Sequence, residues 1–275
     1  MVAGSALWGG QRSKRFNVPP ENVAVVGNPR VDQFTAASRT EVLSRLDLDP
    51  GRCTLLWLPT FRRGSAGDGR TWHDADGLSS RTAVAEPVQA LSRAAEEHHV
   101  QLVVKPHPLD ADAYAGFGIT VLSHARLAQA GVTLYQLLGA ADAIISDVSS
   151  VWVDFLTLDR PVGFYIPDVA ELQVGRGFNV DDLESLLPGP LIETPADADR
   201  FVRTVATEPN QLRPSQFPGF ARIGAVQGRP RVADRLLDWL DDFQRARNRD
   251  PLFTRGAGPA RSLDSPATED RGDPS

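Results

Sequence analysis

Residues 143–155, AIISDVSSVWVDF, combine the signals that decide the fold of this chain. The apolar run 143–146 has the length of a buried strand, and apolar residues at helical spacing begin after Ser149 and Ser150. A strand that leads through serines into a helix brings free N–H groups, hydroxyls and the positive end of a helix dipole together. This combination binds phosphate without a metal, although either serine could equally be an ordinary helix N-cap.

Four further apolar runs are predicted to be buried strands: VAVV (23–26), TLLWL (54–58), QLVVK (101–105) and VGFYI (162–166). Helical patterns lie between the runs, and Thr133 and Gln136 have the spacing of a capping box at the start of one helix. Strands that alternate with helices in this way indicate βαβ units. We therefore predict an α/β fold with a Rossmann-like parallel sheet flanked by helices, buried on both faces.

The domain organisation follows from where this pattern begins and stops. Residues 1–15 are interpreted as a remnant of, or linker from, a preceding domain, and residues 16–244 as one Rossmann-like domain. Residues 245–275 mix charge, proline and glycine without periodicity, so we expect a disordered tail. No apolar run approaches the ~18 residues of a membrane span, and no secretory signal is recognisable, which favours a cytoplasmic protein.

Composition argues against several classes of function. The net charge is −6 and no dense Lys/Arg run occurs, so nucleic-acid binding is not expected. The single cysteine, Cys53, lies in an apolar run and is interpreted as a small buried hydrophobe. No H-x-x-x-H and no cysteine cluster indicates a metal site. No G-x-G-x-x-G, G-K-[ST] or G-x-S-x-G motif occurs, which argues against a dinucleotide-binding protein, a P-loop NTPase and a serine hydrolase.

Residues that suit a phosphate follow the predicted strands. Ligands of an open parallel sheet bind beyond the carboxyl ends of its strands. Thr60 and Arg62 follow one strand, and Lys105 and His107 follow the next. The prolines on both sides of His107 fix its direction, and its imidazole could donate to a phosphate or protonate a leaving group. The alternative for His107 is a turn histidine bonded to a carbonyl.

Asp154 lies one helical turn after Ser150, on the same side of the predicted helix. Its carboxylate could accept hydrogen bonds from a hydroxylated ligand, and a solvent-facing aspartate is the alternative. Trp152 and Phe155 are expected to pack into the core rather than to stack on a base.

Five segments, taken in order, resemble the CDP-glycerol glycerophosphotransferase family, the teichoic-acid primases and polymerases. They are VVGNPRVDQF (25–34), LWLPTFR (56–62), VKPHP (104–108), residues 141–168 around SDVSSVWVDF, and RGFNVDDLESLLPGPLIET (176–194). The resemblance covers about residues 16–240. It implies a GT-B fold, of which residues 16–244 would be the C-terminal, donor-nucleotide-binding half.

The resemblance also implies a donor site and a reaction. An acceptor hydroxyl would attack the glycerol-linked phosphorus of CDP-glycerol and release CMP, without a metal or other cofactor. His107, the candidate catalytic residue, and the serine pair would hold the diphosphate, and Asp154 would lie near the glycerol. The full set of candidate site residues is Thr60, Arg62, Lys105, His107, Ser149, Ser150, Asp154 and Arg176.

The expected partners are a CDP-glycerol donor and a lipid-linked or polymer hydroxyl acceptor, at the inner face of the cell membrane. The family's first half, which holds the acceptor, would precede residue 16. The chain is thus expected to be a fragment or a free-standing donor domain, inactive in transfer without an N-terminal partner domain. Two alternatives are another GT-B glycosyltransferase with a nucleotide-activated sugar, and a non-catalytic nucleotide-binding module.

Overall fold

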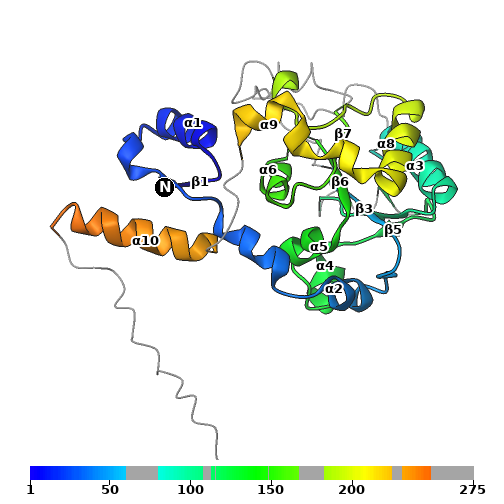
Figure 1. Ribbon diagram of the computed structural model, residues 1–275. Coiled ribbons are helices and arrows are strands. Elements are labelled where there is room, and N and C mark those ends of the chain that lie inside the picture. Colours follow the sequence, from blue (N-terminus) through cyan, green and yellow to red (C-terminus); the bar gives the residue numbers. More distant parts are fainter. Residues whose placement is uncertain are drawn as a thin grey trace, which may run out of the picture. The chain divides into compact units, whose positions relative to one another are not determined.

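The computed structural model describes residues 1–59, 80–107, 113–114, 116–147, 149–166, 183–224 and 231–248. The chain divides into two compact units, Met1–Leu236 and Leu237–Ser275. The first unit contains a five-stranded parallel sheet of strand order β5-β4-β3-β6-β7 (Figure 1). Its strands are β3 (Thr54–Trp57), β4 (Gln101–Val104), β5 (Thr120–Val121), β6 (Ala143–Ser146) and β7 (Val162–Phe164). The predicted Rossmann-like parallel sheet is confirmed.

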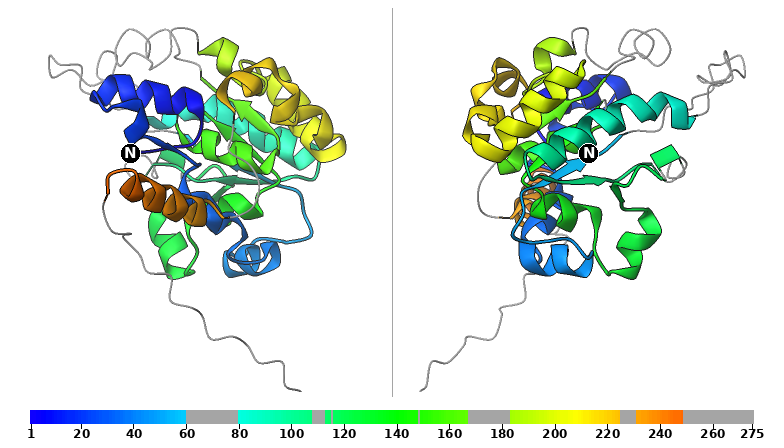
Figure 2. Two further views of the ribbon diagram at one scale, coloured as in Figure 1. Left: turned by 60° about the vertical axis from the view of Figure 1, so that its left-hand side comes forward. Right: turned by 90° about the vertical axis from the view of Figure 1, so that its right-hand side faces the viewer.

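Helices cover both faces of this sheet, which explains why its strands are continuous apolar runs (Figure 2). Alternate side chains of β3 point to opposite faces, so Leu56 belongs to one core cluster and Leu55 to the other, and neither is exposed. The helices packed on the Leu56 face include α2 (Arg39–Arg45), α4 (His124–Gln129) and α5 (Leu134–Ala140). Those on the Leu55 face are α3 (Ser80–Glu97) and α8 (Pro195–Thr207).

Local signals placed two of the helices correctly. The capping box at the start of α5 is confirmed, because Gln136 N donates to Thr133 Oγ1 (3.2 Å) and Thr133 N donates to Gln136 Oε1 (2.8 Å). The helix predicted after β6 is present as α6 (Val151–Phe155), which continues as a 3₁₀ turn, η4 (Leu156–Leu158). Trp152 and Phe155 are buried in the core, as predicted.

Residues 23–26 do not join the main sheet, which corrects the prediction for that run. β2 (Ala24–Val25) instead pairs with β1 (Val2–Ala3) in a separate two-stranded parallel sheet beside α1 (Ala6–Phe16). Val25 is 41% exposed, whereas all residues of the central strands β3 and β6 are buried. Residues 1–15 thus contribute a strand and most of a helix to the first unit, and Trp8 packs against the main core.

The segment LPGPL (187–191) lies along β7. Phe164 N donates to Pro190 O (2.9 Å), and Ile192 N donates to Phe164 O (2.7 Å). Gly189 permits this approach, since a Cβ there would lie 1.9 Å from the carbonyl oxygen of Val162. Part of the segment 176–194, the last of the five that resemble the family, therefore has a structural role at the sheet edge.

The remaining elements connect these layers. They are η1 (Pro20–Asn22), η2 (Pro29–Thr35), η5 (Glu184–Leu186), η6 (Pro209–Leu212), η7 (Pro214–Gln216), α9 (Pro218–Ile223) and α10 (Val232–Arg245). Asp32 caps α10, because its carboxylate accepts bonds from Val232 N and Ala233 N, both 2.9 Å. The described helices include none with the length and apolarity that crossing a membrane requires. Residues 249–275 of the predicted tail lie outside the described residues.

Candidate functional site

The carboxyl edge of the main sheet has a topological switch point between β3 and β6. From β3 the chain moves outward to β4 and β5, and then returns to β6 on the other side of β3. The helix after β3 lies on one face, and the two helices before β6 lie on the other. In open α/β sheets the resulting crevice, just beyond the strand ends, is where ligands bind.

Several predicted site residues meet at this edge. Lys105 and His107 follow β4, and Ser149 and Ser150 follow β6. β3 lies between these two strands, so the two pairs begin on the order of 10 Å apart across the sheet. Thr60 and Arg62, which continue from β3, and Arg176 lie outside the described residues.

Lys105 is a half-buried cation at the end of β4. Its backbone N–H donates to Trp57 O (2.9 Å) and extends the pairing with β3, while its Nζ donates to Pro106 O (3.0 Å). Burial lowers the pKa of the Lys105 ammonium from its usual value, so an anion nearby would stabilise the charge. His107, two residues on, is exposed.

The serines after β6 differ from each other. Ser149 N donates to Asp147 Oδ1 (3.1 Å), and Ser149 Oγ accepts a long bond from Val151 N (3.4 Å). Ser150 stands at the N-cap position of α6, as one interpretation expected, but it is exposed and makes no side-chain capping bond there. The hydroxyl of Ser146 is buried and has no partner among the described residues. Because α6 has only five residues, hydroxyl and N–H donors matter more here than a long helix dipole.

Asp154 is buried, so the solvent-facing alternative is wrong. It is 3% exposed and accepts hydrogen bonds from Asn28 Nδ2, Arg30 Nε (2.7 Å) and the Tyr135 hydroxyl (2.6 Å). Burying a carboxylate requires such compensation. The segment GNPR (27–30) delivers two of the three donors, and Gly27, with φ +97°, makes the turn that brings them there.

Arg30 is a site residue that the sequence did not reveal. A second nitrogen of its guanidinium lies 2.7 Å from Asp154, and the group stacks over the ring of Tyr135 at 5.4 Å. Burial, followed by the charge of Asp154, raises the pKa of Tyr135, which therefore remains a hydroxyl donor. The Arg30 side chain is 46% exposed, so it offers a fixed cation close to the helix that begins after Ser150. The only indication in the sequence that Arg30 could belong to the site was its position directly after the conformationally restricted Pro29.

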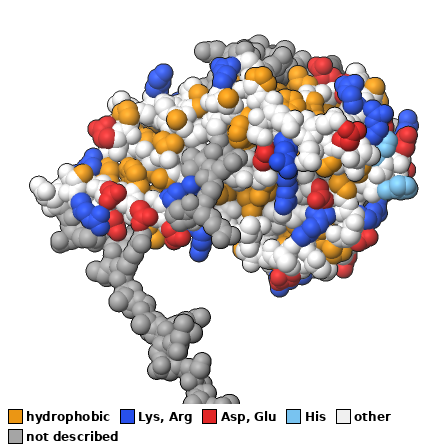
Figure 3. Space-filling model, in the orientation of Figure 1, with side chains coloured by type: hydrophobic (Ala, Val, Ile, Leu, Met, Phe, Trp, Pro, Cys, Tyr) orange, Lys and Arg blue, Asp and Glu red, His pale blue; other side chains and the backbone are white. Residues whose placement is uncertain are grey.

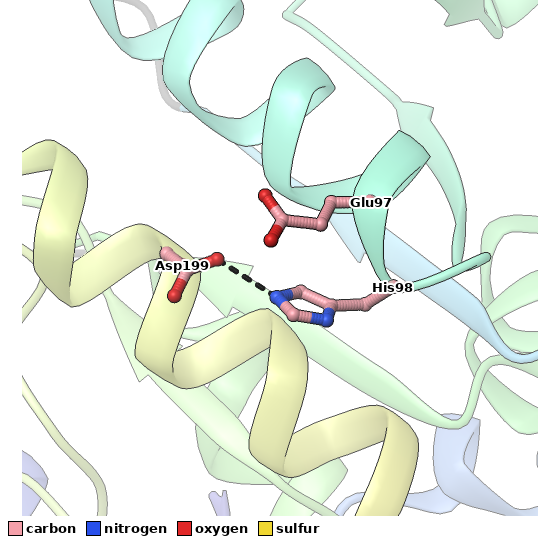
Figure 4. A group of neighbouring side chains, drawn as sticks. All are labelled: Glu97, His98 and Asp199. Atoms are coloured by element: carbon pink, nitrogen blue, oxygen red, sulfur yellow. Dashed lines mark hydrogen bonds and ion pairs between the residues drawn. The ribbon is translucent and has the colours of Figure 1, made fainter.

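One group of described residues could hold a metal ion: Glu97, His98 and Asp199, whose ligand atoms lie within 4.8 Å of one another (Figure 4). His98 Nε2 already contacts Asp199 Oδ1 at 2.7 Å and so joins the end of α3 to α8. The end of α3 leads into the start of β4, which is the opposite edge of the sheet from Lys105. On the face shown in Figure 3, acidic and basic side chains lie interspersed.

The topological switch point, with the cationic and hydroxyl groups that follow its strands, is typical of a Rossmann-like domain that binds an anionic ligand. A sequence profile of the CDP-Glycerol:Poly(glycerophosphate) glycerophosphotransferase family matches residues 10–215. The chain belongs to this family.

Its relatives include teichoic acid enzymes. The chain is 26% identical over 239 residues to the teichoic acid ribitol-phosphate primase of Bacillus spizizenii, covering 84% of this chain and 56% of that protein. It is 28% identical over 176 residues to the teichoic acid glycerol-phosphate primase of Bacillus subtilis, covering 64% and 41%. The wall teichoic acid polymerase TagF has the same fold over 86% of this chain and 56% of its own, with a TM-score of 0.62 at 18% identity. The chain thus spans about half the length of these proteins.

Proposed function

We propose that the chain is the donor-binding half of a glycerophosphotransferase of teichoic-acid-like polymer synthesis. It would bind CDP-glycerol so that an acceptor hydroxyl attacks the glycerol-linked phosphorus. A new P–O bond to the acceptor forms, the phosphoanhydride bond breaks, and CMP departs with the bonding electrons. The hydroxyl proton passes to a base outside the residues named here. Family membership and the activities of the relatives support this reaction class.

The observation that carries the proposal is the collection of phosphate-suited groups at the switch point. Lys105 and His107 approach from β4, Ser149 and Ser150 from β6, and Arg30 from the segment held by Asp154. Hydrogen bonds from charged donors to phosphate are about twice as strong as neutral ones. We assign His107 and the serine pair to the diphosphate, where His107 stabilises or protonates the departing CMP.

Asp154 serves this site through Arg30. Its buried carboxylate already accepts three hydrogen bonds from protein side chains, and in this proposal its main role is to hold the Arg30 guanidinium in a fixed direction. Thr60, Arg62 and Arg176 complete the donor site in this proposal. The transfer needs no metal, because lysine, histidine and arginine supply the positive charge that a metal would otherwise supply.

The acceptor would be a lipid-linked or polymer hydroxyl, held by an N-terminal partner domain that forms the opposite wall of the cleft. Binding such an acceptor would place the protein in the cytoplasm at the inner face of the membrane.

Titration calorimetry with CDP, UDP and cytidine tests the donor assignment. We expect CDP to bind more tightly than either of the other two. Preference for UDP would indicate a glycosyltransferase that uses a nucleotide-activated sugar.

CMP release from CDP-glycerol, with a glycerol-phosphate-primed acceptor, tests the reaction. The chain should release CMP only when the N-terminal half of a relative is added, since positioning the acceptor supplies roughly 7–11 kcal/mol. Activity should survive EDTA. Binding without turnover under both conditions would instead identify a non-catalytic nucleotide-binding module.

A further inference from the structure

A second site lies at the amino edge of the main sheet, opposite the donor site. A cavity of about 510 Å³ opens there at the starts of β3, β6 and β7, and its wall includes the last turn of α8 and η6. This volume falls within the range of small-molecule sites, ~300–1,000 Å³. The strands are parallel, so the cavity and the groups after β4 and β6 are separated by the length of the sheet.

The cavity is positively charged in a chain whose net charge is −6. Its charged lining consists of Arg39, Arg52, Arg160, Arg213, Asp142 and Asp159, a net charge of +2. Asp142 pairs with Arg39 (2.8 Å), and Asp159 lies 3.9 Å from Arg213. Within the described part of the chain, neither Arg52 nor Arg160 forms an ion pair with a carboxylate, although Asp142 is near enough to act on the charge of Arg160. Two guanidinium charges therefore remain to be balanced.

Both of these arginines are held in place by backbone carbonyls. One terminal nitrogen of Arg160 donates to Gly139 O (2.8 Å) and Ala141 O (2.6 Å), at the end of α5. Arg52 uses one terminal nitrogen to reach Val100 O (3.2 Å). A guanidinium has five N–H donors, so each side chain keeps donors for a ligand after these bonds. Burial lowers the pKa of Arg160, but a guanidinium stays charged at neutral pH. A bound anion would offset the free-energy cost of burying this charge.

The other lining groups favour an organic ligand. Pro161 and Val205 add apolar surface beside the arginines. Cys53 also lines the cavity, and burial raises the pKa of its thiol to about 11, so it adds no negative charge at neutral pH. We propose that this cavity binds a small organic molecule through its phosphate group, held by Arg52 and Arg160.

Cys53 provides a direct readout, because it is the only cysteine of the chain and lines the cavity. The rate of its alkylation by N-ethylmaleimide at pH 8 would be followed by mass spectrometry. Glycerol 3-phosphate, inorganic phosphate and glycerol would be titrated in separate series. We expect glycerol 3-phosphate to slow the alkylation saturably and glycerol to have no effect. If inorganic phosphate acts at an equal or lower concentration, the site recognises free phosphate, which contradicts an organic ligand.

Arg52→Gln tests the contact, and it should fold normally because Arg52 is exposed at the rim. The half-protecting concentration of glycerol 3-phosphate should rise about tenfold or more. Arg200→Gln is the charge-matched control: this exposed residue of α8 pairs with Asp197, does not line the cavity, and should leave protection unchanged. CDP affinity should be the same in both variants. Equal protection in Arg52→Gln and the wild type, or protection by glycerol, would overturn the proposal.

Discussion

The two edges of the five-stranded sheet both carry basic side chains but hold them differently. At the carboxyl edge, Lys105 and His107 follow β4, and the serines that precede α6 follow β6, on the other side of β3. At the amino edge, Arg39 and Arg160 donate to the carbonyls at the end of α5. In a βαβ fold the helices begin at the carboxyl edge, with free N–H groups, and end at the amino edge, with free carbonyls.

This polarity gives the two edges different energetic roles. Arg39 and Arg160 satisfy the carbonyls at the end of α5 whether or not a ligand is bound, so their loss should affect folding, whereas Arg52 is exposed at the rim. Ser149 and Ser150 bond little within the protein, so their loss should affect binding alone. Asp154 is the exception at the carboxyl edge, since it is buried and bonded to three side chains.

Asp154→Ala should have the largest effect. It removes the partner of Arg30 and Tyr135 and should lower the free energy of unfolding by about 3 kcal/mol. This is the low end of the range for breaking a buried ion pair, because Arg30 is half exposed. Urea denaturation measures this loss. Asp242→Ala, an exposed aspartate, is the control and should change stability by less than about 0.5 kcal/mol. A similarly small loss in Asp154→Ala would mean that the network around Asp154 contributes nothing to stability.

The double variant Ser149→Ala, Ser150→Ala should separate binding from folding. If each lost bond to phosphate is worth ~1.5–3 kcal/mol, the Kd for CDP should rise at least tenfold. The melting temperature should change little, because Ser150 has no capping bond and that of Ser149 is long. Calorimetry with CDP is the measurement, and protection of Cys53 by glycerol 3-phosphate should be unaffected. An unchanged Kd in a folded protein would exclude a phosphate contact by these serines.

His107→Ala should discriminate between two ligands. The proposed contact is to phosphate, so affinity for CDP should fall by about tenfold while affinity for cytidine stays nearly constant. His107 is exposed, and folding should be unaffected. Equal losses for CDP and cytidine would show that His107 shapes the pocket without contacting phosphate.

The sequence predicted the parts of the fold that local pattern determines. The run 143–146 is β6 with the predicted bounds, because a short apolar run between polar residues has no competing structure. The capping box of Thr133 and Gln136 is likewise local. β5 was missed, since the two residues Thr120 and Val121 carry no periodicity. The run 23–26 was assigned to the wrong sheet, because strand pairing depends on partners distant in sequence.

The same limit applies to the candidate site. Residues next to strand ends could be found, since every parallel strand directs its carboxyl end to one edge. The environment of Asp154 could not, because its donors Asn28 and Arg30 lie 126 and 124 residues away in sequence. The cavity at the amino edge was also hidden. Cys53 was interpreted as a buried hydrophobe, whereas it is only partly buried and lines that cavity.

Cys53 gives the smallest expected effect, and it reports on the amino edge. Burial, followed by the charge of Asp142, raises the pKa of the thiol from 9.0 to about 11, while the charge of Arg39 lowers it. Between these values the unfolded chain loses the thiol proton and the folded chain keeps it. The unfolded state then binds fewer protons, so the free energy of unfolding falls as pH rises, with no such dependence well below pH 9.

The Cys53→Ala variant has no thiol and therefore lacks this dependence. All other titrating groups are the same in both proteins, so the difference between their free energies of unfolding isolates the effect of the thiol. Urea denaturation of both proteins from pH 7 to 10 should show a constant difference up to about pH 8. By pH 10 the wild type should have lost more than the variant, by less than about 1 kcal/mol, because the thiol is only partly buried and water screens its interactions. Parallel profiles up to pH 10 would mean that the thiol titrates as it does in the unfolded chain. The cavity wall around Cys53 would then be open to water.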